Sequence, residues 1–213
     1  MKKYVFLGFL HFILITSLKA QQWNIRYGID LHVSAPTYGI SNVTPGTSRQ
    51  ADKTYGLGLS GMIEASKWRL LAIQSGLTLQ SLGAKLQYSE FGKTTVTQHT
   101  YWAQIPLNIV FRLPFPRKSG HDLFISSGPY AGLGLFGSNS FLSNYEGIPT
   151  DFHFGNQGSQ KRFDYGLQAS FGYQIKRKYK LSVGYLDGLA DLSTSSRYEQ
   201  RNRAWSASLG YSF

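Results

Sequence analysis

The sequence predicts an all-β fold, an eight-stranded antiparallel up-and-down transmembrane β-barrel that forms one domain over residues 21–213. Three observations predict it: apolar and polar residues alternate along eight segments, long and short connections alternate between those segments, and the chain ends on an alternating segment that finishes with Phe213. A strand of this kind has one apolar and one polar face. Closing such strands into a barrel pairs every backbone edge and turns the apolar face to lipid.

Residues 1–20 have the features of a secretory signal peptide. Lys2 and Lys3 precede an uncharged apolar run over 4–18, and Ala20 closes the segment. The run is shorter than the ~20 apolar residues of a spanning helix, which favours a cleaved leader over a membrane anchor. The absence of cysteine excludes a lipid-modified cysteine after the cut and, with it, disulfides and thiolate metal ligands.

The charge balance of the remaining chain favours an anionic partner. Removing Lys2, Lys3 and Lys19 from the 22 basic residues leaves 19, against 11 acidic residues. An exported chain rarely meets nucleic acid, so we expect membrane lipid, including lipopolysaccharide, to be the partner and nucleic acid not to be. The mean hydropathy of −0.22 agrees with a barrel, because only alternate residues meet lipid.

Each of the eight segments is predicted to be a strand from its parity, meaning that apolar residues fall on odd positions and polar residues or glycine on even positions. Residues 23–33, 55–65 and 71–81 follow the rule closely. In 99–113, Pro106 lacks a backbone donor and predicts a bulge. In 123–136 the pattern is weaker, because Phe124, Tyr130 and Phe136 fall on the inner parity.

Residues 163–175 show the clearest alternation, and 181–185 and 204–213 complete the set. Most are near the ~9–11 residues that cross a bilayer as a tilted strand. The connections 34–54, 83–98, 137–161 and 187–202 are long, whereas 66–70, 114–122 and 176–180 are short. Short turns of outer-membrane barrels face the periplasm, so both termini are expected there.

Charged residues on the inner parity predict a polar lumen. They are Arg26, Asp30, His32, Glu64, Arg112 and Asp164. Eight strands enclose a lumen that side chains fill, and buried charges are tolerated when paired. A structural network is therefore expected, and a narrow proton or ion path is the alternative.

No catalytic, cofactor-binding or metal-binding residue is assigned, and the chain is not expected to be an enzyme. His99 with Thr97 and Thr100, or His153 with Asp151, could assist a nucleophile, but solvated histidines explain them more simply. His121 falls in a short turn at the other end, and neither a Gly-x-Ser-x-Gly nor a His-Glu-x-x-His motif occurs.

Several exposed charges and aromatic residues are expected near the membrane interfaces. Arg197, Arg201 and Arg203 approach the last strand, where they suit either lipid phosphate or solvent. Asp187 and Asp191 suit turn formation better than calcium binding. At the opposite end we expect Lys176, Arg177, Lys178, Tyr179 and Lys180 among headgroups, with Trp23, Trp68, Tyr173, Tyr211 and Phe213 in an aromatic belt.

The segments also resemble the outer-membrane β-barrel domain family of Bacteroidetes that includes PorT-like proteins. Residues 101–107, with Ile105-Pro106-Leu107, and residues 127–132, with Gly128-Pro129-Tyr130, are similar to its strand motifs, as are residues 163–167 and the ending 210–213. The resemblance covers essentially the whole mature chain. It implies an eight-stranded outer-membrane barrel and, for PorT itself, a part in type IX secretion.

These observations predict a structural or interaction role through external loops, with other envelope or secretion proteins as further partners. The alternatives are an accessory role in type IX protein secretion and a lipid A-modifying enzyme. On fold, the alternative is a soluble ligand-binding barrel of lipocalin type, in which the apolar parity would face inward.

Overall fold

The computed structural model describes residues 23–42, 49–88, 94–115, 120–141 and 152–213. The expected signal peptide over 1–20 lies outside the described residues. No helix in the described part of the chain has the length and apolar character needed to cross a membrane.

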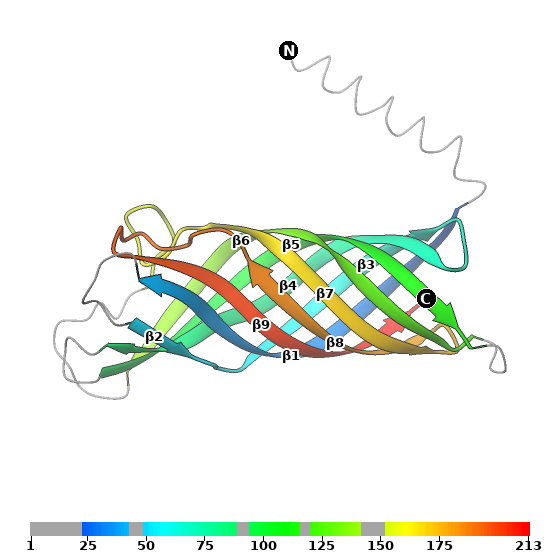
Figure 1. Cartoon of the computed structure of the whole chain (residues 1–213), viewed down its shortest axis with the longest axis horizontal. Coiled ribbons are helices and arrows are strands. Elements are labelled where there is room, and N and C mark those ends of the chain that lie inside the picture. The colour runs from blue at the N-terminus through cyan, green and yellow to red at the C-terminus, as the bar shows by residue number, and fades with distance from the viewer. Residues whose placement is uncertain (1–22, 43–48, 89–93, 116–119, 142–151) are drawn as a thin grey trace, which may run out of the picture.

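The described chain is a barrel of long tilted strands (Figure 1). The strands are β1 (Asn24–Asn42), β2 (Arg49–Asp52), β3 (Gly56–Ser66), β4 (Leu71–Tyr88), β5 (Thr94–Pro114), β6 (Asp122–Phe141), β7 (Phe163–Ile175), β8 (Tyr179–Gly188) and β9 (Tyr198–Ser212). We call the end that holds Phe213 and the β3–β4, β5–β6 and β7–β8 connections the turn end. The opposite end is the loop end.

The sheet closes on itself through eight antiparallel strands, because β9 pairs with β1 and β4 pairs with β5. The short β2 adds to β4 beyond β3. The stagger of the strands can be measured by following cross-strand partners once around the barrel. The path starts at Ala35 on β1 and passes through Trp205, Tyr185, Ala169, Ser127, Ile109, Ile73 and Ala65 to Ile25. The circuit returns to β1 ten residues from its start, which is the stagger of strongly tilted strands.

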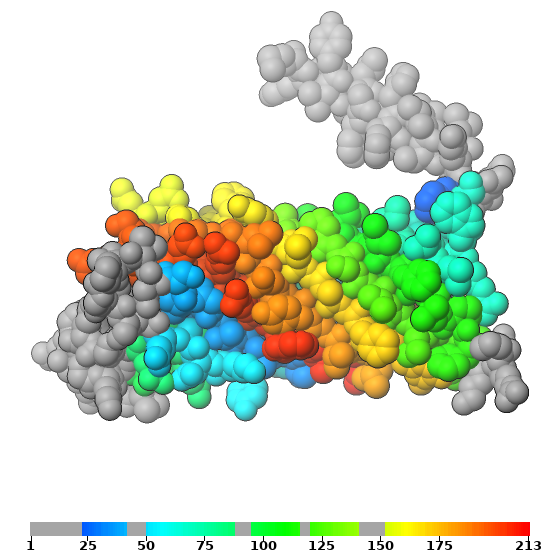
Figure 2. All heavy atoms as spheres, in the orientation of Figure 1, coloured from blue at the N-terminus to red at the C-terminus, as the bar shows by residue number. Residues whose placement is uncertain are grey.

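The predicted parity is confirmed, and the apolar residues face outward. Leu31 is 65% exposed, Leu209 is 66% exposed and Phe163 is 73% exposed, whereas polar side chains such as Gln104 and Asn202 are buried inside. An apolar outside around a polar inside contradicts the lipocalin-type alternative. Figure 2 shows β1 (blue), β7 (yellow), β8 (orange) and β9 (red) contributing side chains to the visible wall.

Aromatic side chains gather at both ends of the apolar wall, where a bilayer has its interfaces. Exposed rings toward the loop end belong to Tyr55, Tyr101, Phe136, Phe163, Tyr165 and Trp205, and those toward the turn end to Trp23, Tyr27, Trp68, Phe115, Tyr179 and Phe213. Tyr179 packs on Tyr211, and Tyr211 packs on Phe213, with ring centroids 5.4 and 5.2 Å apart. The expected belt at the turn end is therefore present.

The strands run further toward the loop end than predicted. Much of the expected connections 34–54, 83–98, 137–161 and 187–202 continues the ladders of β1, β4, β5, β6 and β9, and β2 also lies there. Backbone pairing needs no apolar outer face, so strands continue where alternation of apolar residues ends. The predicted boundaries were wrong at this end for that reason.

The bulge lies elsewhere than predicted. Pro106 interrupts the ladder, but pairing resumes in the same register at Thr78↔Gln104. The register shifts instead where Tyr101 pairs with Phe136 and Trp102 with Gly134, which leaves Leu135 extra. This extra residue turns Phe136 outward, where it stacks on Tyr101 with ring centroids 4.5 Å apart.

Candidate functional site

The lumen is the candidate site, and its turn end is filled by a buried ion cluster. The Glu64 carboxylate lies between two guanidinium groups, with Arg26 Nη2 at 2.9 Å from Oε1 and Arg112 Nη2 donating to Oε2. The side chains of Glu64 and Arg112 are 6% and 5% exposed. This cluster confirms the predicted pairing for three of the inner charges. It blocks this end of the lumen, and the Glu64 carboxylate neutralises part of the positive charge of the two arginines.

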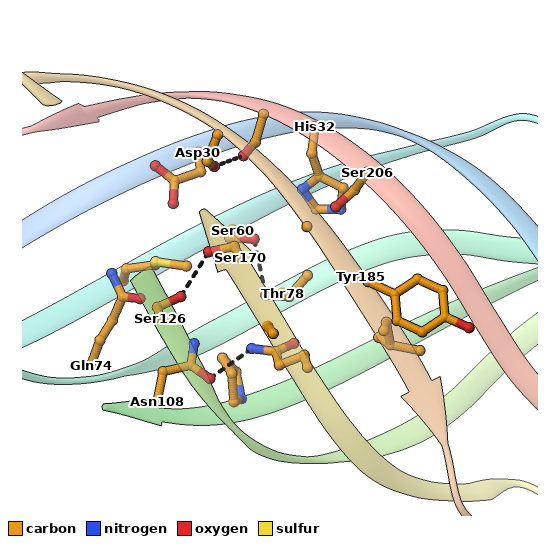
Figure 3. Close-up of a pocket in the computed structure, with 18 of the residues that line it drawn as sticks. Asp30, His32, Ser60, Gln74, Thr78, Asn108, Ser126, Ser170, Tyr185 and Ser206 are labelled. Atoms are coloured by element: carbon orange, nitrogen blue, oxygen red, sulfur yellow. Dashed lines mark hydrogen bonds between the residues drawn. The ribbon is translucent and has the colours of Figure 1, made fainter. Parts of the chain in front are cut away.

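A polar cavity of about 130 Å³ lies in the lumen on the loop-end side of the ion cluster (Figure 3). Asp30, His32 and Lys180 are its acidic and basic lining residues. Carboxamides and hydroxyls line most of the rest, from Gln74, Gln80, Gln104, Asn108, Gln168, Ser60, Thr78, Ser126, Ser170, Ser182, Ser206 and Ser208. We call this cavity the chamber; its polarity and volume suit several hydrogen-bonded waters.

Hydrogen bonds between strands hold the chamber wall. His32 Nε2 donates to Gln80 Oε1 at 3.2 Å, and Gln80 in turn donates to Gln104. Gln168 Nε2 donates to Asn108 Oδ1 at 3.0 Å. Serine and threonine hydroxyls pair across neighbouring strands at 2.6–2.9 Å, in Ser60 with Thr78, Ser126 with Ser170, and Ser182 with Ser208. The polar lining is thus mostly bonded to itself, which fixes the wall rather than preparing a reactive group.

Asp30 and Lys180 share one row of the chamber wall. Asp30 pairs with Gly210 on β9, and Gly210 pairs with Lys180 on β8. Since Gly210 carries no side chain, the Asp30 carboxylate lies over β9 between its own strand and the lysine. The prediction that Lys180 lies among headgroups was wrong: it lines the chamber, as its parity next to the outward Leu181 requires.

The loop end of the lumen is closed by an apolar plug. Leu82, Trp102, Tyr130, Leu186, Ala190, Leu192 and Ala204 form one buried cluster, with Phe154 packed against it. The Trp102 and Phe154 rings meet edge to face with centroids 5.1 Å apart. The missing side chain of Gly134 makes room for Phe154, whose ring atoms would lie 2.5 Å from a β-carbon there. Two of these plug residues come from the last connection, so that connection is part of the core.

Residues 152–162 and 189–197 form a cap over the plug. Lys161 N donates to Leu192 O at 2.8 Å, and Thr194 Oγ1 donates to Gly158 O at 2.9 Å. The Asp191 carboxylate accepts from the backbone N–H groups of Ser193 and Gln200 and from Lys161 Nζ. Burial alone would raise the pKa of Asp191, but these bonds outweigh it and hold the pKa below its ordinary value.

Asp164, the remaining predicted inner charge, lies beside the plug. Tyr130 Oη donates to Asp164 Oδ2 at 3.0 Å, and Asn202 Nδ2 donates to the same oxygen at 2.8 Å. Tyr130 lies on the inner parity of its segment, where an apolar residue made the predicted pattern weaker. It faces the lumen and holds the Asp164 carboxylate in place.

The histidine candidates are not brought together. His99 and Thr100 lie on opposite faces of β5, and the buried Thr100 hydroxyl accepts from Trp102 Nε1 at 2.9 Å. His153 is exposed in the cap, and its expected neighbour Asp151 lies outside the described residues. His121 lies at the turn end, with Nδ1 at 2.7 Å from Tyr173 Oη. Within the described ranges, no three His, Asp or Glu side chains are grouped to hold a metal ion.

The charged candidates near the last strand form pairs. Arg203 Nε donates to Asp187 Oδ1 at 2.8 Å, and Arg201 Nη2 donates to Glu199 Oε2 at 3.0 Å. Arg197 is exposed. The turn-forming interpretation is confirmed for Asp191, whereas Asp187 belongs to β8.

Sequence reasoning missed the residues that close the lumen. Leu192 and Ala190 fall in a segment predicted to be a loop, so neither was predicted to be buried. Gln80 and Gln104 lie on the inner parity, as predicted, and Lys180 could have been found in the same way, because it lies on the inner parity of its strand.

Comparison with known proteins agrees with the barrel fold described above. The family model described as outer membrane protein beta-barrel domain matches residues 19–194. No curated protein matches the chain.

Solved structures similar to the chain share little of its sequence. They include OprG from Pseudomonas aeruginosa, with 13% identity, coverage of 90% of this chain and 95% of that chain, and a TM-score of 0.49. Neisserial surface protein A has 12% identity, 88% and 97% coverage, and a TM-score of 0.46. Ail of Yersinia pestis, solved with the heparin analogue sucrose octasulfate, has 11% identity, 89% and 99% coverage, and a TM-score of 0.43. Strand pairing within this chain establishes the barrel, and the match over most of its length establishes the family: the chain belongs to the outer membrane protein beta-barrel domain family.

Proposed function

We propose that this outer-membrane barrel has a structural or interaction role through its loop end and does not serve as a diffusion pore. The observation that carries the proposal is the filled lumen. The apolar plug closes the loop end, and the Arg26–Glu64–Arg112 cluster fills the turn end. A solute would have to displace Trp102 and Leu192, both fully buried, to pass. In the described part of the chain, the outer wall and the cap remain available to partners.

Solute uptake tests this proposal. Folded barrel in vesicles should leave them as impermeable to a small sugar as protein-free vesicles, measured by swelling. A variant that opens both closures, with Leu192→Gly and Phe154→Gly in the plug and Arg26→Ser, Glu64→Ser and Arg112→Ser in the ion cluster, is the matched positive control. Swelling with the unmodified barrel would overturn the proposal.

We propose that the turn end, with both termini, faces the periplasm and the loop end faces outward. Support comes from the short connections at the turn end and the long strand extensions and cap at the loop end. The chain has no cysteine, so single-cysteine variants are cleanly labelled. In intact cells an impermeant maleimide should label Lys85→Cys at the loop end and leave Lys67→Cys at the turn end unlabelled. The reverse pattern would overturn the orientation.

Membrane lipid, including lipopolysaccharide, is the partner we propose at the outer wall of the loop end. Arg162 is exposed directly before the interfacial Phe163, and Arg203 lies two residues from the interfacial Trp205. Both positions are suited to headgroup phosphates. Lipopolysaccharide should raise the unfolding temperature of the barrel, and Arg162→Gln should reduce that rise; an unchanged rise would contradict this contact.

A PorT-like branch within the family, with an accessory role in type IX secretion, is the second candidate. The Ile105-Pro106-Leu107 and Gly128-Pro129-Tyr130 motifs favour it: Pro106 lines the chamber and pairs with Tyr130, which belongs to the plug. Deletion of the gene should then abolish release of secreted cargo, and normal release would remove the candidate.

A further inference from the structure

The turn between β7 and β8 has an unusual backbone for its sequence. Lys178 N donates to Ile175 O at 3.0 Å, and the two central residues, Lys176 and Arg177, have φ angles of 50° and 56°. Two central residues with positive φ define the type I′ turn, which favours Asn-Gly. Residues with a β-carbon are strained in this region. Lys176 and Arg177 therefore occupy a left-handed backbone conformation that residues of their type rarely adopt.

The turn end has an excess of positive charge. Lys176, Arg177 and Lys178 are exposed at the tip of this turn, and Lys67 and Arg69 are exposed in the β3–β4 connection. We call these five residues the basic rim. None of the ion pairs among the described residues includes a member of the rim.

Acidic groups at this end do not balance the rim. Glu64 is 5% exposed and bound to two arginines, and Asp122 is 3% exposed within the lumen wall. Among the described residues of this end, Glu64 and Asp122 are the acidic side chains. Most of the counter-charge for the rim therefore has to come from another molecule.

Neighbouring aromatic residues place the rim at headgroup depth. Trp68, 64% exposed, stands between Lys67 and Arg69, and Tyr179, 56% exposed, follows Lys178 directly. Tryptophan and tyrosine rings occupy the interface between hydrocarbon and water. Basic groups one residue beyond them meet the layer of lipid phosphates.

The tip is also held in place. Arg177 N donates to Gly120 O of the β5–β6 connection at 2.8 Å, and Lys178 O accepts from Ser212 N at 2.7 Å. The tip charges thus stand at a fixed position on the rim instead of swinging on a free loop, which reduces the ordering cost of binding.

We propose that the basic rim docks the phosphates of anionic phospholipids in the leaflet at the turn end, and that Lys176 and Arg177 occupy a left-handed turn for the sake of this contact. Charge complementarity and the adjacent aromatic belt select a lipid surface as the occupant.

The test compares the barrel in vesicles of phosphatidylcholine alone with vesicles that also contain phosphatidylglycerol. The unfolding temperature, followed by loss of the compact gel band, should rise with phosphatidylglycerol for the unmodified chain. The variant K176N/R177G receives the preferred type I′ pair and loses two charges. It should unfold at a higher temperature than the unmodified chain in phosphatidylcholine, yet show a clearly smaller rise with phosphatidylglycerol, because two of the five rim charges are gone.

Two matched variants separate charge from turn geometry. K176R/R177K keeps both charges and should keep the full rise, and K53Q/K85Q removes two exposed charges at the loop end and should keep it as well. An equal rise for K176N/R177G and the unmodified chain would overturn the proposal, as would an equal loss in K53Q/K85Q. A rise of the same size with soluble polyglutamate in phosphatidylcholine vesicles would assign the rim to an acidic polymer instead.

A direct count of bound lipid provides the second measurement. In native mass spectrometry of the detergent-folded barrel, phosphatidylglycerol should remain bound to the unmodified chain and be reduced in K176N/R177G. Equal retention of phosphatidylcholine and phosphatidylglycerol by the unmodified chain would contradict a phosphate-charge contact.

Discussion

The Asp30 carboxylate lies across Gly210, with Oδ1 at 1.8 Å from the point where a β-carbon of residue 210 would stand. The two residues are cross-strand partners at the seam where β9 closes on β1. A side chain at 210 would displace the carboxylate from its position beside Lys180.

We therefore expect Gly210→Ala to lower the free energy of unfolding by about 1–3 kcal/mol, the usual range for overpacking. Asp30→Ala should remove most of this cost in the double variant, because the clashing atoms are gone. Gly61→Ala is the control: nothing lies within 4 Å of its β-carbon position. Equilibrium unfolding in denaturant gives the free energy of unfolding of the unmodified chain and of each variant. If Gly210→Ala lowers this free energy equally with and without the Asp30 side chain, the contact is contradicted.

Glu64→Gln should be among the most damaging single changes in the lumen. It leaves Arg26 and Arg112 without their shared carboxylate, and breaking a buried pair costs about 3–5 kcal/mol. Glu199→Gln breaks an exposed pair with Arg201 and should cost at most about 1 kcal/mol. Comparable unfolding free energies for the two variants would show that the cluster is not buried as described.

Leu192→Ala should destabilise the barrel by about 2–5 kcal/mol, because this fully buried side chain belongs to the plug although it comes from a connection. Leu189→Ala, in the same connection but 44% exposed, is the matched control and should change little. Tryptophan fluorescence during denaturant unfolding reports the difference. A negligible effect of Leu192→Ala would mean that the cap does not pack into the lumen.

The cap should loosen in acid. The pKa of Asp191 is lowered from 3.8 by the N–H groups of Gln200 and Ser193 and by Lys161, against the effect of burial. A carboxylate with a depressed pKa contributes stability above its unfolded pKa and loses it as pH falls through the folded pKa. Cleavage by pepsin within the cap should therefore increase as pH falls below 3.8.

Asp191→Asn serves as the control for that titration, because an amide cannot change charge. Its cap should be cut more readily than the unmodified cap above pH 3.8 and should show a flatter pH dependence. Identical pH profiles for the two chains would remove Asp191 as the acid-sensitive group.

Parity predicted the wall of the barrel well, because the two faces of each spanning strand meet different solvents. Leu31 and Leu209 outside and Glu64 and Arg112 inside follow directly from it. The same rule places Lys180 in the chamber, where its position beside a basic turn was misleading. Parity failed beyond Leu135, since one extra residue reverses the faces and nothing local in the sequence marks it.

The loop end was less predictable for a physical reason. In the extensions of β1 and β4 the apolar residues face inward instead of outward: Tyr38, Ala84 and Leu86 form a second buried cluster, so the outward apolar parity ends before the strands do. Leu192 and Phe154 reach the plug through long-range contacts that local periodicity does not encode. The chamber could be anticipated as a polar lumen, whereas its closure could be found only from the folded chain.

Single-channel recording tests the closed lumen most directly. The folded mature barrel in a planar bilayer should show no stepwise ion current, because the apolar plug and the Arg26–Glu64–Arg112 cluster interrupt any water path. A variant that opens both closures, with Leu192→Gly and Phe154→Gly in the plug and Arg26→Ser, Glu64→Ser and Arg112→Ser in the ion cluster, should show steps or frequent openings. Stable current steps from the unmodified barrel would contradict the account.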